Sequence, residues 1–216
     1  MNAVVVLAGD FPTGSHIDLL LKKADFLVAA DGGAEPLLNI NVIPDLLIGD
    51  MDSISEATRK QLLGSSCEYI VFPRDKDATD AELAIDHVIA KGAKKITLIG
   101  VEGGPRIDHQ LASMLLLLSI KYKSVTLCAA TSTSQIYGIT DDTIVGDCNN
   151  GDTLSILPLV SKAIGVSTTG LLWPLQNTNL HLGSSRSVSN QCTGLSFSVS
   201  VTKGSLLIIQ TLGRKN

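Results

Sequence analysis

The chain has 216 residues, of which 44% are hydrophobic and 18% charged, so it is long enough to bury a core and its composition argues against disorder. Its formal net charge of -4 gives no support to a nucleic-acid or anionic-membrane partner. The four cysteines are widely spaced and form no C-x-x-C pair, which argues against a zinc site and indicates reduced thiols in a cytoplasmic protein.

The first half of the chain alternates short apolar runs with helical patterns. The apolar runs predict strands over 3–8, 26–30, 46–48, 69–72, 96–99 and 125–129, and the helical patterns predict helices over 16–23, 56–63, 81–91 and 109–121. Two of these helix starts have capping-box spacing, Ser53-x-x-Glu56 and Thr79-x-x-Glu82. Strands that alternate with helices predict an α/β fold with a doubly wound, mostly parallel sheet.

After about residue 130 the composition changes, and serine, threonine, glycine and asparagine become frequent. Short β-branched runs predict strands over 153–157, 163–167, 195–201 and 206–210, and Asn150-Gly151 is typical of a hairpin turn. This pattern predicts a C-terminal all-β domain, a sandwich or jelly roll. We therefore expect two domains, over residues 1–135 and 136–216.

The stretch PDLLIGDMDS, residues 44–53, places two acids directly after a predicted buried strand. Asp50 and Asp52 follow the apolar run 46–48 with one residue between them. In open α/β sheets, ligands bind beyond the carboxyl ends of the strands, so these two carboxylates should lie at a ligand site. Paired carboxylates in such a place are typical ligands of Mg²⁺, which shares its remaining positions with phosphate oxygens.

Other acids follow other predicted strands. Asp31 follows the strand 26–30, Asp77 and Asp80 follow the strand 69–72, and Asp108 follows the strand 96–99. A single aspartate after a strand is usually a cap or turn residue, and Asp80 also fits a helix start. Several acids at one sheet edge, however, repel one another unless a cation compensates them, and one or two Mg²⁺ ions with a polyphosphate would do so.

The same loops contain basic residues and glycines. Arg74, Lys76 and Arg106 could bind phosphate oxygens, and Gly32 and Gly33 allow backbone N–H groups to approach an anion. Acids, bases and glycines together indicate phosphoryl-type transfer. The chain has neither a complete P-loop, because the lysine is missing, nor a G-x-G-x-x-G fingerprint.

Four segments resemble thiamine pyrophosphokinase, in order and across nearly the whole chain. They are ADGGAEPLLNINVIPDLLIGDMDSI, KDATDAELAI, GGPRIDHQLASMLLL and the C-terminal TTGLLWPL with SVSN. The resemblance implies an N-terminal α/β nucleotide-binding domain, a C-terminal β-sandwich for thiamine binding and dimerisation, and a homodimer with active sites between subunits. It also implies transfer of pyrophosphate from ATP to the hydroxyl of thiamine, with release of AMP.

The resemblance further implies roles for individual residues. The Mg²⁺ and phosphate-site acids are expected to be Asp50, Asp52 and Asp77. The nucleotide or thiamine site is expected to include Asp31, Thr79, Asp80, Arg106, Asp108 and His109, although a histidine such as His109 taken alone is more often structural. The thiamine side is expected to be formed by Trp173, Ser189 and Asn190 of the partner subunit, with an aromatic face against a cationic heterocycle.

One departure from the family and two alternatives remain open. The family usually has glycine directly before the Arg-x-Asp-His segment, whereas Pro105 stands there in this chain and removes an N–H group. The first alternative is a related pyrophosphokinase acting on another alcohol, such as a hydroxymethylpterin. The second is a nucleotide-sensing module that keeps the acids and turns nothing over.

Overall fold

The computed structural model describes residues 1–213, which divide into two compact units. One unit consists of residues 1–116 and 122–132, and the other of residues 117–121 together with the chain from Thr133 onward. The predicted functional boundary between residues 135 and 136 remains a proposal.

The N-terminal unit is built on a parallel sheet. Its strands lie side by side in the order β6-β5-β1-β2-β3-β4, and each neighbouring pair runs parallel. Their bounds are β1 (Asn2–Val6), β2 (Phe26–Ala30), β3 (Leu46–Gly49), β4 (Glu68–Val71), β5 (Lys95–Ile99) and β6 (Thr126–Ala130). Because the central strands are apolar on both faces, they are buried between helices, as the sequence predicts.

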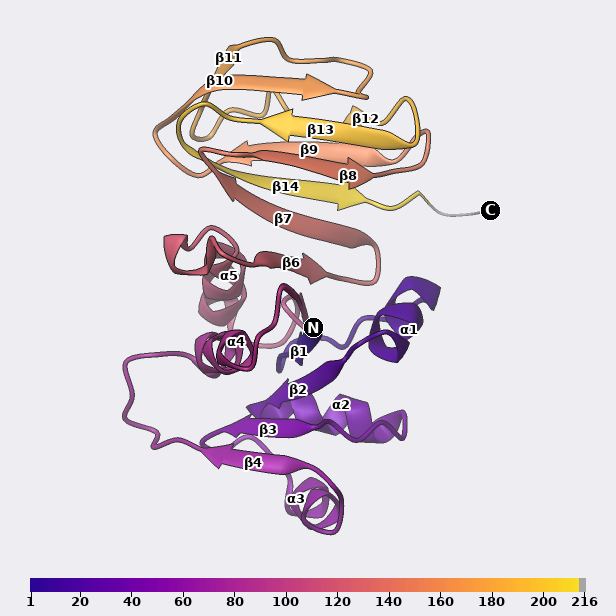
Figure 1. Cartoon of the computed structure of the whole chain (residues 1–216), viewed down its shortest axis with the longest axis vertical. Coiled ribbons are helices and arrows are strands. Elements are labelled where there is room, and N and C mark those ends of the chain that lie inside the picture. Colours follow the sequence, from indigo (N-terminus) through magenta and orange to yellow (C-terminus); the bar gives the residue numbers. More distant parts are fainter. Residues whose placement is uncertain (214–216) are drawn as a thin grey trace. The chain divides into compact units, whose positions relative to one another are not determined.

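The helices cover both faces of this sheet. Figure 1 shows α1 and α2 on one side of the strands and α4 and α5 on the other. The helices are α1 (Ser15–Lys22), α2 (Ala34–Asn39), α3 (Glu56–Leu63), α4 (Asp80–Ala90) and α5 (Ile107–Leu116), with 3₁₀ turns at Asp31–Gly33 and Ile120–Tyr122. The predicted α/β fold is therefore confirmed. Helix α2 was not predicted, because six residues are too few to show helical periodicity.

One of the two predicted helix N-caps forms at the predicted residue. The Thr79 hydroxyl accepts a hydrogen bond of 3.2 Å from the Glu82 N–H at the start of α4. At α3 the prediction is wrong by two residues, because Ser55 directly precedes the helix and its Oγ accepts from the Thr58 N–H at 3.2 Å. Ser53 instead turns toward the acidic loops described below.

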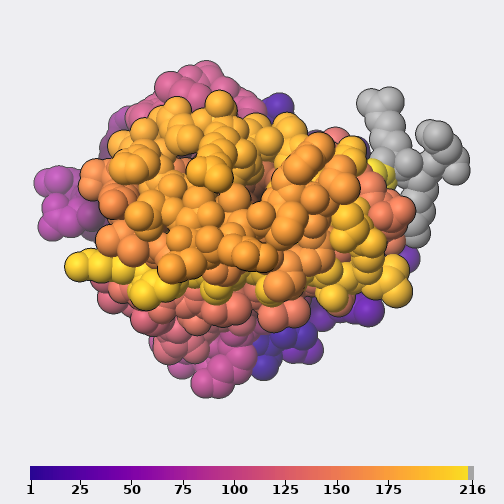
Figure 2. Space-filling view, turned by 90° about the horizontal axis from the view of Figure 1, so that it is seen from above, coloured from indigo at the N-terminus to yellow at the C-terminus, as the bar shows by residue number. Residues whose placement is uncertain are grey.

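The C-terminal unit is an antiparallel sandwich. Its sheets have the strand orders β12-β9-β14-β7 and β11-β10-β13-β8. The strands are β7 (Ser134–Thr140), β8 (Thr143–Asp147), β9 (Thr153–Pro158), β10 (Lys162–Thr169), β11 (Thr178–His181), β12 (Asn190–Gln191), β13 (Ser196–Ser200) and β14 (Ser205–Thr211). Alternate residues of both sheets, such as Leu154 and Phe197, meet in one apolar core. This confirms the predicted sandwich, and Figure 2 shows its surface hollowed near the centre of the view.

The Asn150-Gly151 turn is present, but it does not close a hairpin. Gly151 has φ +90°, as such a turn requires, yet the strands on either side do not pair with each other. Strand β8 pairs with β13, whereas β9 pairs with β14 and β12. The turn therefore carries the chain from one sheet of the sandwich to the other. Within the described residues, no helix has the length and apolar character needed to cross a bilayer.

Candidate active site

A cavity of about 890 Å³ lies in the N-terminal unit, at the carboxyl ends of the parallel strands. Its walls come from the loops after β1, β2, β3, β4 and β5, and the strand order changes direction between β1 and β5. Ligands of open α/β sheets bind at such a switch point. The lining includes these sequence-predicted residues: Asp31, Gly32, Asp50, Asp52, Arg74, Lys76, Asp77, Thr79, Asp80, Arg106 and His109.

Three carboxylates meet in this cavity. One oxygen each of Asp31, Asp50 and Asp52 lies within 4.8 Å of the other two. The backbone brings them together, because Gly49 has φ +152° and an added Cβ there would lie 3.0 Å from the Asp31 Cβ. The Asp52 N–H also donates to Asp50 Oδ1 at 3.1 Å, which fixes the turn between these two acids.

Asp31 is the most constrained acid of the group. Its backbone has φ +46°, a strained conformation for a residue other than glycine, and its side chain is 8% exposed. The Ser53 hydroxyl donates a hydrogen bond to Oδ2, whereas the buried Oδ1 has no hydrogen-bond partner in the described part of the chain. Burial raises the pKa of Asp31 and outweighs the Ser53 hydrogen bond, and the negative charges of Asp80, Asp50 and Asp52 raise it further.

This arrangement fits a divalent metal ion. A buried carboxylate oxygen without a donor is costly, and a hard cation would compensate it together with the two neighbouring carboxylates. Asp31, Asp50 and Asp52 offer the oxygen ligands that such an ion prefers. Asp77, predicted from the sequence as a metal ligand, lines the same cavity but does not belong to this three-acid group.

Basic side chains balance part of the negative charge. Lys76 Nζ lies 3.0 Å from Asp80 Oδ1 and 3.7 Å from Asp50 Oδ2, and the Lys76 side chain is only 13% exposed. Arg74 Nη2 lies 3.5 Å from Asp52 Oδ2 on the exposed rim. The pKa of Asp50 is lowered, mainly by the Asp52 N–H and also by the positive charges of Lys76 and Arg74. Asp50 thus carries a negative charge at neutral pH.

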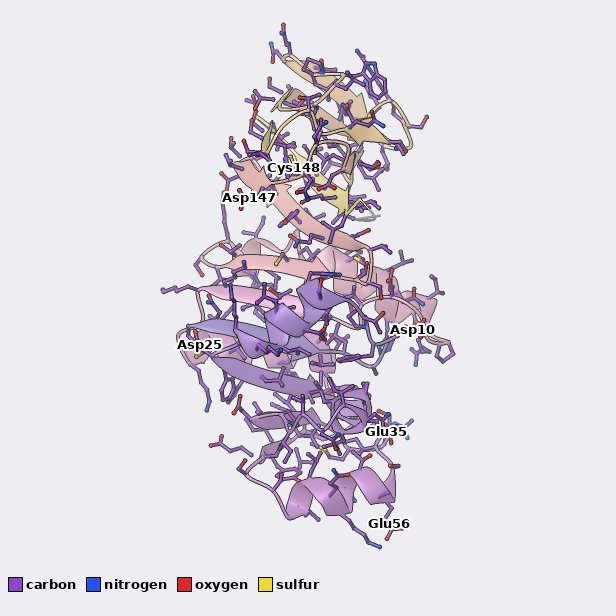
Figure 3. The ribbon with its side chains drawn as sticks, turned by 90° about the vertical axis from the view of Figure 1, so that its right-hand side faces the viewer. Asp10, Asp25, Glu35, Glu56, Asp147 and Cys148 are labelled. Atoms are coloured by element: carbon purple, nitrogen blue, oxygen red, sulfur yellow. The ribbon has the colours of Figure 1, made fainter. Side chains whose placement is uncertain are left out.

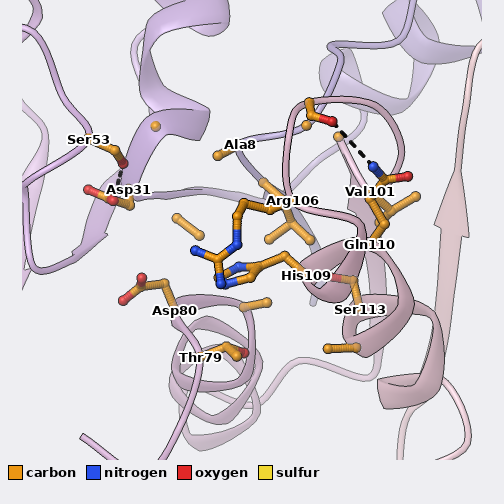
Figure 4. Close-up of a pocket in the computed structure, with 18 of the residues that line it drawn as sticks. Ala8, Asp31, Ser53, Thr79, Asp80, Val101, Arg106, His109, Gln110 and Ser113 are labelled. Atoms are coloured by element: carbon orange, nitrogen blue, oxygen red, sulfur yellow. Dashed lines mark hydrogen bonds between the residues drawn. The ribbon is translucent and has the colours of Figure 1, made fainter. Parts of the chain in front are cut away.

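The loop after β5 holds Arg106 at the cavity. Arg106 Nε and Nη2 donate to the two oxygens of Asp108 at 2.9 and 2.6 Å, which raises the pKa of Arg106 and lowers that of Asp108. Asp108 itself does not line the cavity, whereas Pro105 does. Figure 4 shows Arg106 from this loop and His109 from the first turn of α5 reaching into the cavity, with Asp80 and Thr79 on another wall.

Some residues of the site were not predicted, and one predicted glycine lies outside it. Glu35, which is labelled in Figure 3, and Ser53 line the cavity. Glu35 Oε1 accepts from the Ser55 N–H at 2.9 Å. Pro36, near the start of α2, is the sequence signal that could have revealed this short helix. Gly33 does not line the cavity, and a Cβ there would meet the Val6 carbonyl oxygen at 2.1 Å.

A second, smaller cavity of about 200 Å³ lies in the C-terminal unit. Trp173 and Asn190 line it, whereas Ser189 does not. The Trp173 side chain is 60% exposed, which is unusual for so large an apolar group. Arg186 supplies the positive charge among the lining residues, and none of them is acidic.

The fold and the larger cavity define a class of protein. A parallel sheet with carboxylates and basic side chains at its switch point is suited to binding a polyphosphate together with a divalent metal. The antiparallel sandwich adds an exposed aromatic residue in a second cavity.

Comparisons with known proteins identify the family within this class. The family model described as "Thiamin pyrophosphokinase, catalytic domain" matches residues 17–129, and the "Thiamin pyrophosphokinase, vitamin B1 binding domain" matches residues 142–206. Thiamine pyrophosphokinase of Bacillus subtilis is 30% identical over 190 residues, which cover 85% of this chain and 86% of that protein. Thiamine pyrophosphokinase 1 of Oryza sativa is 25% identical, with 87% and 79% covered. The chain therefore belongs to the thiamin pyrophosphokinase family, which confirms the resemblance inferred from its sequence.

Solved structures agree with this assignment. The crystal structure of the Bacillus subtilis enzyme superposes with a TM-score of 0.83 at 25% identity, covering 98% of this chain and 99% of that one. The Candida albicans thiamin pyrophosphokinase has a TM-score of 0.84 at 20% identity, covering 98% and 90%, and so supports the fold.

Proposed function

We propose that the protein transfers pyrophosphate from ATP to the hydroxyl of thiamine, giving thiamine diphosphate and AMP in a Mg²⁺-dependent reaction. The observation that carries this proposal is the group formed by Asp31, Asp50 and Asp52 in the cavity at the carboxyl ends of the strands, in a chain of the thiamin pyrophosphokinase family. A buried acid with an unpartnered oxygen makes little sense for stability alone, because it destabilises the metal-free fold.

The three acids would hold Mg²⁺, and Asp77 is a further candidate ligand on the same wall. When bound, Mg²⁺ would neutralise the polyphosphate and stabilise the departing AMP. Since Ser53 donates to Asp31 and the Asp52 N–H donates to Asp50, the acids are oriented before any ligand arrives. Such preorganisation means that binding does not have to order these side chains.

The basic residues would bind the phosphate oxygens. Lys76 is held between Asp50 and Asp80 at the floor of the cavity, and Arg74 and Arg106 stand at its rim. Arg106 would exchange its two hydrogen bonds with Asp108 for phosphate oxygens, which accept the same forked geometry. These contacts would align the thiamine hydroxyl for in-line attack on the β-phosphorus, and a carboxylate of the cavity would accept the hydroxyl proton.

The acceptor side would be formed by Trp173. Its exposed indole offers an aromatic face to a cationic heterocycle, an attraction worth about 0.5–2 kcal/mol. Arg186 in the same cavity would repel a cation, so we expect the thiazolium ring to stay on the acidic side of the substrate site and the neutral pyrimidine ring to lie nearer Arg186.

We further propose a homodimer in which Trp173 of one copy serves the acidic cavity of the other. Helix α5, whose first turn follows Arg106, exposes more than half of Ile107, Leu111 and Leu115, an apolar stripe at helical spacing. An exposed apolar stripe of this kind is typical of a protein–protein interface. The exposed apolar residues next to Trp173 on a second copy would pack against it. The four buried, free cysteines support the predicted cytoplasmic location.

Mixing two impaired variants tests this dimer. Asp52→Asn and Trp173→Ala chains would be unfolded and refolded together and assayed at a thiamine concentration well below KM, where Trp173→Ala alone should keep only about a tenth of the wild-type activity. If sites form between copies, half of the dimers are mixed and each has one intact site, so activity should recover to roughly a quarter of the wild-type value. No recovery in refolded mixtures shown to contain mixed dimers would exclude a shared site.

The reaction is tested by incubating the protein with ATP, Mg²⁺ and thiamine and measuring AMP against ADP. AMP formed only with thiamine, in step with thiamine diphosphate, would support pyrophosphate transfer. ADP would mean that the γ-phosphate is transferred instead. Much better use of a hydroxymethylpterin at equal concentration would favour the related pyrophosphokinase. Binding of ATP and Mg²⁺ without AMP from any acceptor would favour the sensing module.

A further inference from the structure

The backbone around Trp173 is tied down on its N-terminal side by strand-like pairing. The Thr193 N–H donates to the Gly170 carbonyl at 2.9 Å, and the Leu172 N–H donates to the Gln191 carbonyl at 2.8 Å. This pairing stops at Trp173, because the next residue, Pro174, has no N–H to continue it.

The side chain of Asn190 extends the pairing by one step. Its Oδ1 accepts from the Trp173 N–H at 3.1 Å, and its Nδ2 donates to the Trp173 carbonyl at 2.7 Å. The same Oδ1 also accepts from the Gln191 N–H at 2.9 Å. Both lone pairs of the amide oxygen are therefore used by the protein, and the side chain is 7% exposed. Asn190 thus has little capacity left to bind a substrate directly.

The far side of Trp173 is tied down as well. The Leu175 N–H donates to Thr168 Oγ1 at 2.8 Å, and the Thr168 N–H donates to the Leu175 carbonyl at 2.9 Å. Leu175 and Thr168 are both buried. The exposed indole is consequently carried by a backbone that is held on both sides.

We propose that Asn190 is a positioning residue, which fixes the Trp173 backbone so that the indole forms a rigid platform for a ring of the acceptor. The proposal rests on the proposed function in giving Trp173 contact with the acceptor. Its physical basis is that a platform ordered before binding saves the entropy of ordering it during binding. Ser189 supports the same reading, since its φ of +60° is a strained conformation that directs the chain into Asn190.

The chain offers a direct readout, because Trp173 is its single tryptophan. Fluorescence anisotropy decay and acrylamide quenching of the protein without substrate therefore report on this side chain alone. Asn190→Ala should increase local rotation and quenching of Trp173. The matched control is Asn179→Ala, which removes an asparagine whose Oδ1 accepts from the Gly165 N–H at 3.2 Å, and it should leave both signals unchanged.

Kinetics separate positioning from direct binding. Asn190→Ala should raise KM for thiamine roughly tenfold, because two backbone hydrogen bonds of Trp173 are lost, while KM for ATP and kcat change little. Asn190→Asp keeps an acceptor for the Trp173 N–H but sets a carboxylate oxygen against the Trp173 carbonyl in place of the Nδ2 donor, so its anisotropy and KM should change in the same direction as those of Asn190→Ala. Should Asn190→Ala not fold by circular dichroism, Asn190→Asp carries the test through the same comparison.

An unchanged Trp173 anisotropy in the folded Asn190 variants would overturn the proposal. A raised KM for thiamine without any change in Trp173 mobility would also overturn it, since Asn190 would then bind the acceptor itself. If the protein does not use thiamine at all, the proposed function fails while the fluorescence comparison still decides whether Asn190 holds Trp173.

Discussion

The two units build their cavities by different means. In the N-terminal unit, the acids Asp31, Asp50 and Asp52 are crowded together and only partly balanced by Lys76. In the C-terminal unit, the residues that line the smaller cavity are mostly neutral, and an exposed Trp173 stands on a well-bonded backbone. The first site depends on crowded negative charges, which destabilise the fold. The second depends on the position of Trp173, which backbone hydrogen bonds fix.

This difference shows where function costs stability. Crowded carboxylates with a buried, unpartnered oxygen destabilise the fold until a cation binds. The hydrogen bonds that hold Trp173, by contrast, stabilise the fold and the site at once. Asp31→Asn and Asn190→Ala should therefore have opposite effects on stability, although both should reduce activity.

The largest expected effect follows from removing an acid of the metal group. Asp52→Asn should lower kcat by at least about a thousandfold, because it removes a charged side chain from the proposed Mg²⁺ site, and Mg²⁺ would neutralise the polyphosphate. Since Asp52 is about half exposed, the thermal midpoint should stay near that of the wild type. The measurement is AMP release with saturating ATP, Mg²⁺ and thiamine. Asp18→Asn, on exposed α1, is the control, and turnover near wild type in Asp52→Asn would remove that residue from the reaction.

Asp31→Asn should separate stability from activity most clearly. Activity should fall about a hundredfold or more, because the buried metal ligand is lost. The metal-free variant should nevertheless unfold at a higher temperature than the wild type at pH 7. A lower unfolding temperature for Asp31→Asn at pH 7 would contradict the idea that this acid destabilises the fold.

Asp31 should also make the stability and the Mg²⁺ affinity of the protein depend on pH. Burial raises the folded-state pKa of Asp31 above 3.8, so the folded protein binds this proton more tightly than the unfolded chain. The stability of the metal-free protein should therefore be highest, as far as this group is concerned, below pH 3.8, and should decrease as the pH rises through the folded-state pKa. Mg²⁺ affinity should rise over that same interval. Thermal unfolding of the metal-free proteins measures stability, and calorimetric titration with Mg²⁺ measures affinity, each for wild type and Asp31→Asn at several pH values. Equal pH slopes in the two proteins would rule out Asp31 as the source of the pH dependence.

A smaller effect is expected from the platform in the C-terminal unit. Trp173→Ala should raise KM for thiamine roughly tenfold, because the cation–π and stacking contacts are lost. KM for ATP should be unchanged, and Trp173→Phe should recover part of the loss. Steady-state kinetics with each substrate varied in turn distinguish the two constants. Equal increases in both constants would mean that Trp173 serves the whole site and not the acceptor.

The smallest effect concerns the thiols, which lie in both units. Burial raises the pKa of Cys67 to about 11 and that of Cys192 to about 12. Very little thiolate is then present at pH 8, so alkylation of the native protein should be slow in both units and become fast only in denaturant. Mass spectrometry after timed exposure to iodoacetamide checks this, and rapid labelling of either residue in the native protein would contradict it.

The sequence could predict the acidic cavity because each part leaves a local signal. Asp50 and Asp52 follow a run of buried strand residues, and parallel strands bring all such loop ends to one edge. It could not predict that Asp31 would join these two acids while Asp77 stays apart, because this depends on the path allowed by Gly49. Glu35 was missed together with the short helix that carries it.

In the C-terminal unit, the sequence predicted a sandwich but could not predict how Trp173 is held. The bonds from Asn190 and Thr168 join residues that are 17 and 7 positions apart from their partners, and no periodic pattern records them. Ser53 is a further example of a contact that local rules do not predict. Its spacing from Glu56 predicts a helix cap, whereas its hydroxyl donates to Asp31. Pairings that depend on tertiary structure are invisible to local rules.

The division of labour between the two units is tested most directly by measuring substrate binding to two variants. A non-hydrolysable ATP analogue with Mg²⁺ would be titrated calorimetrically into Asp52→Asn and into Trp173→Ala. Thiamine would be titrated into the same two variants in separate experiments. We expect Asp52→Asn to lose affinity for the metal-bound nucleotide while thiamine still quenches its Trp173 fluorescence, and Trp173→Ala to lose affinity for thiamine alone. Parallel loss of affinity for both ligands in both variants would contradict two separately built binding sites.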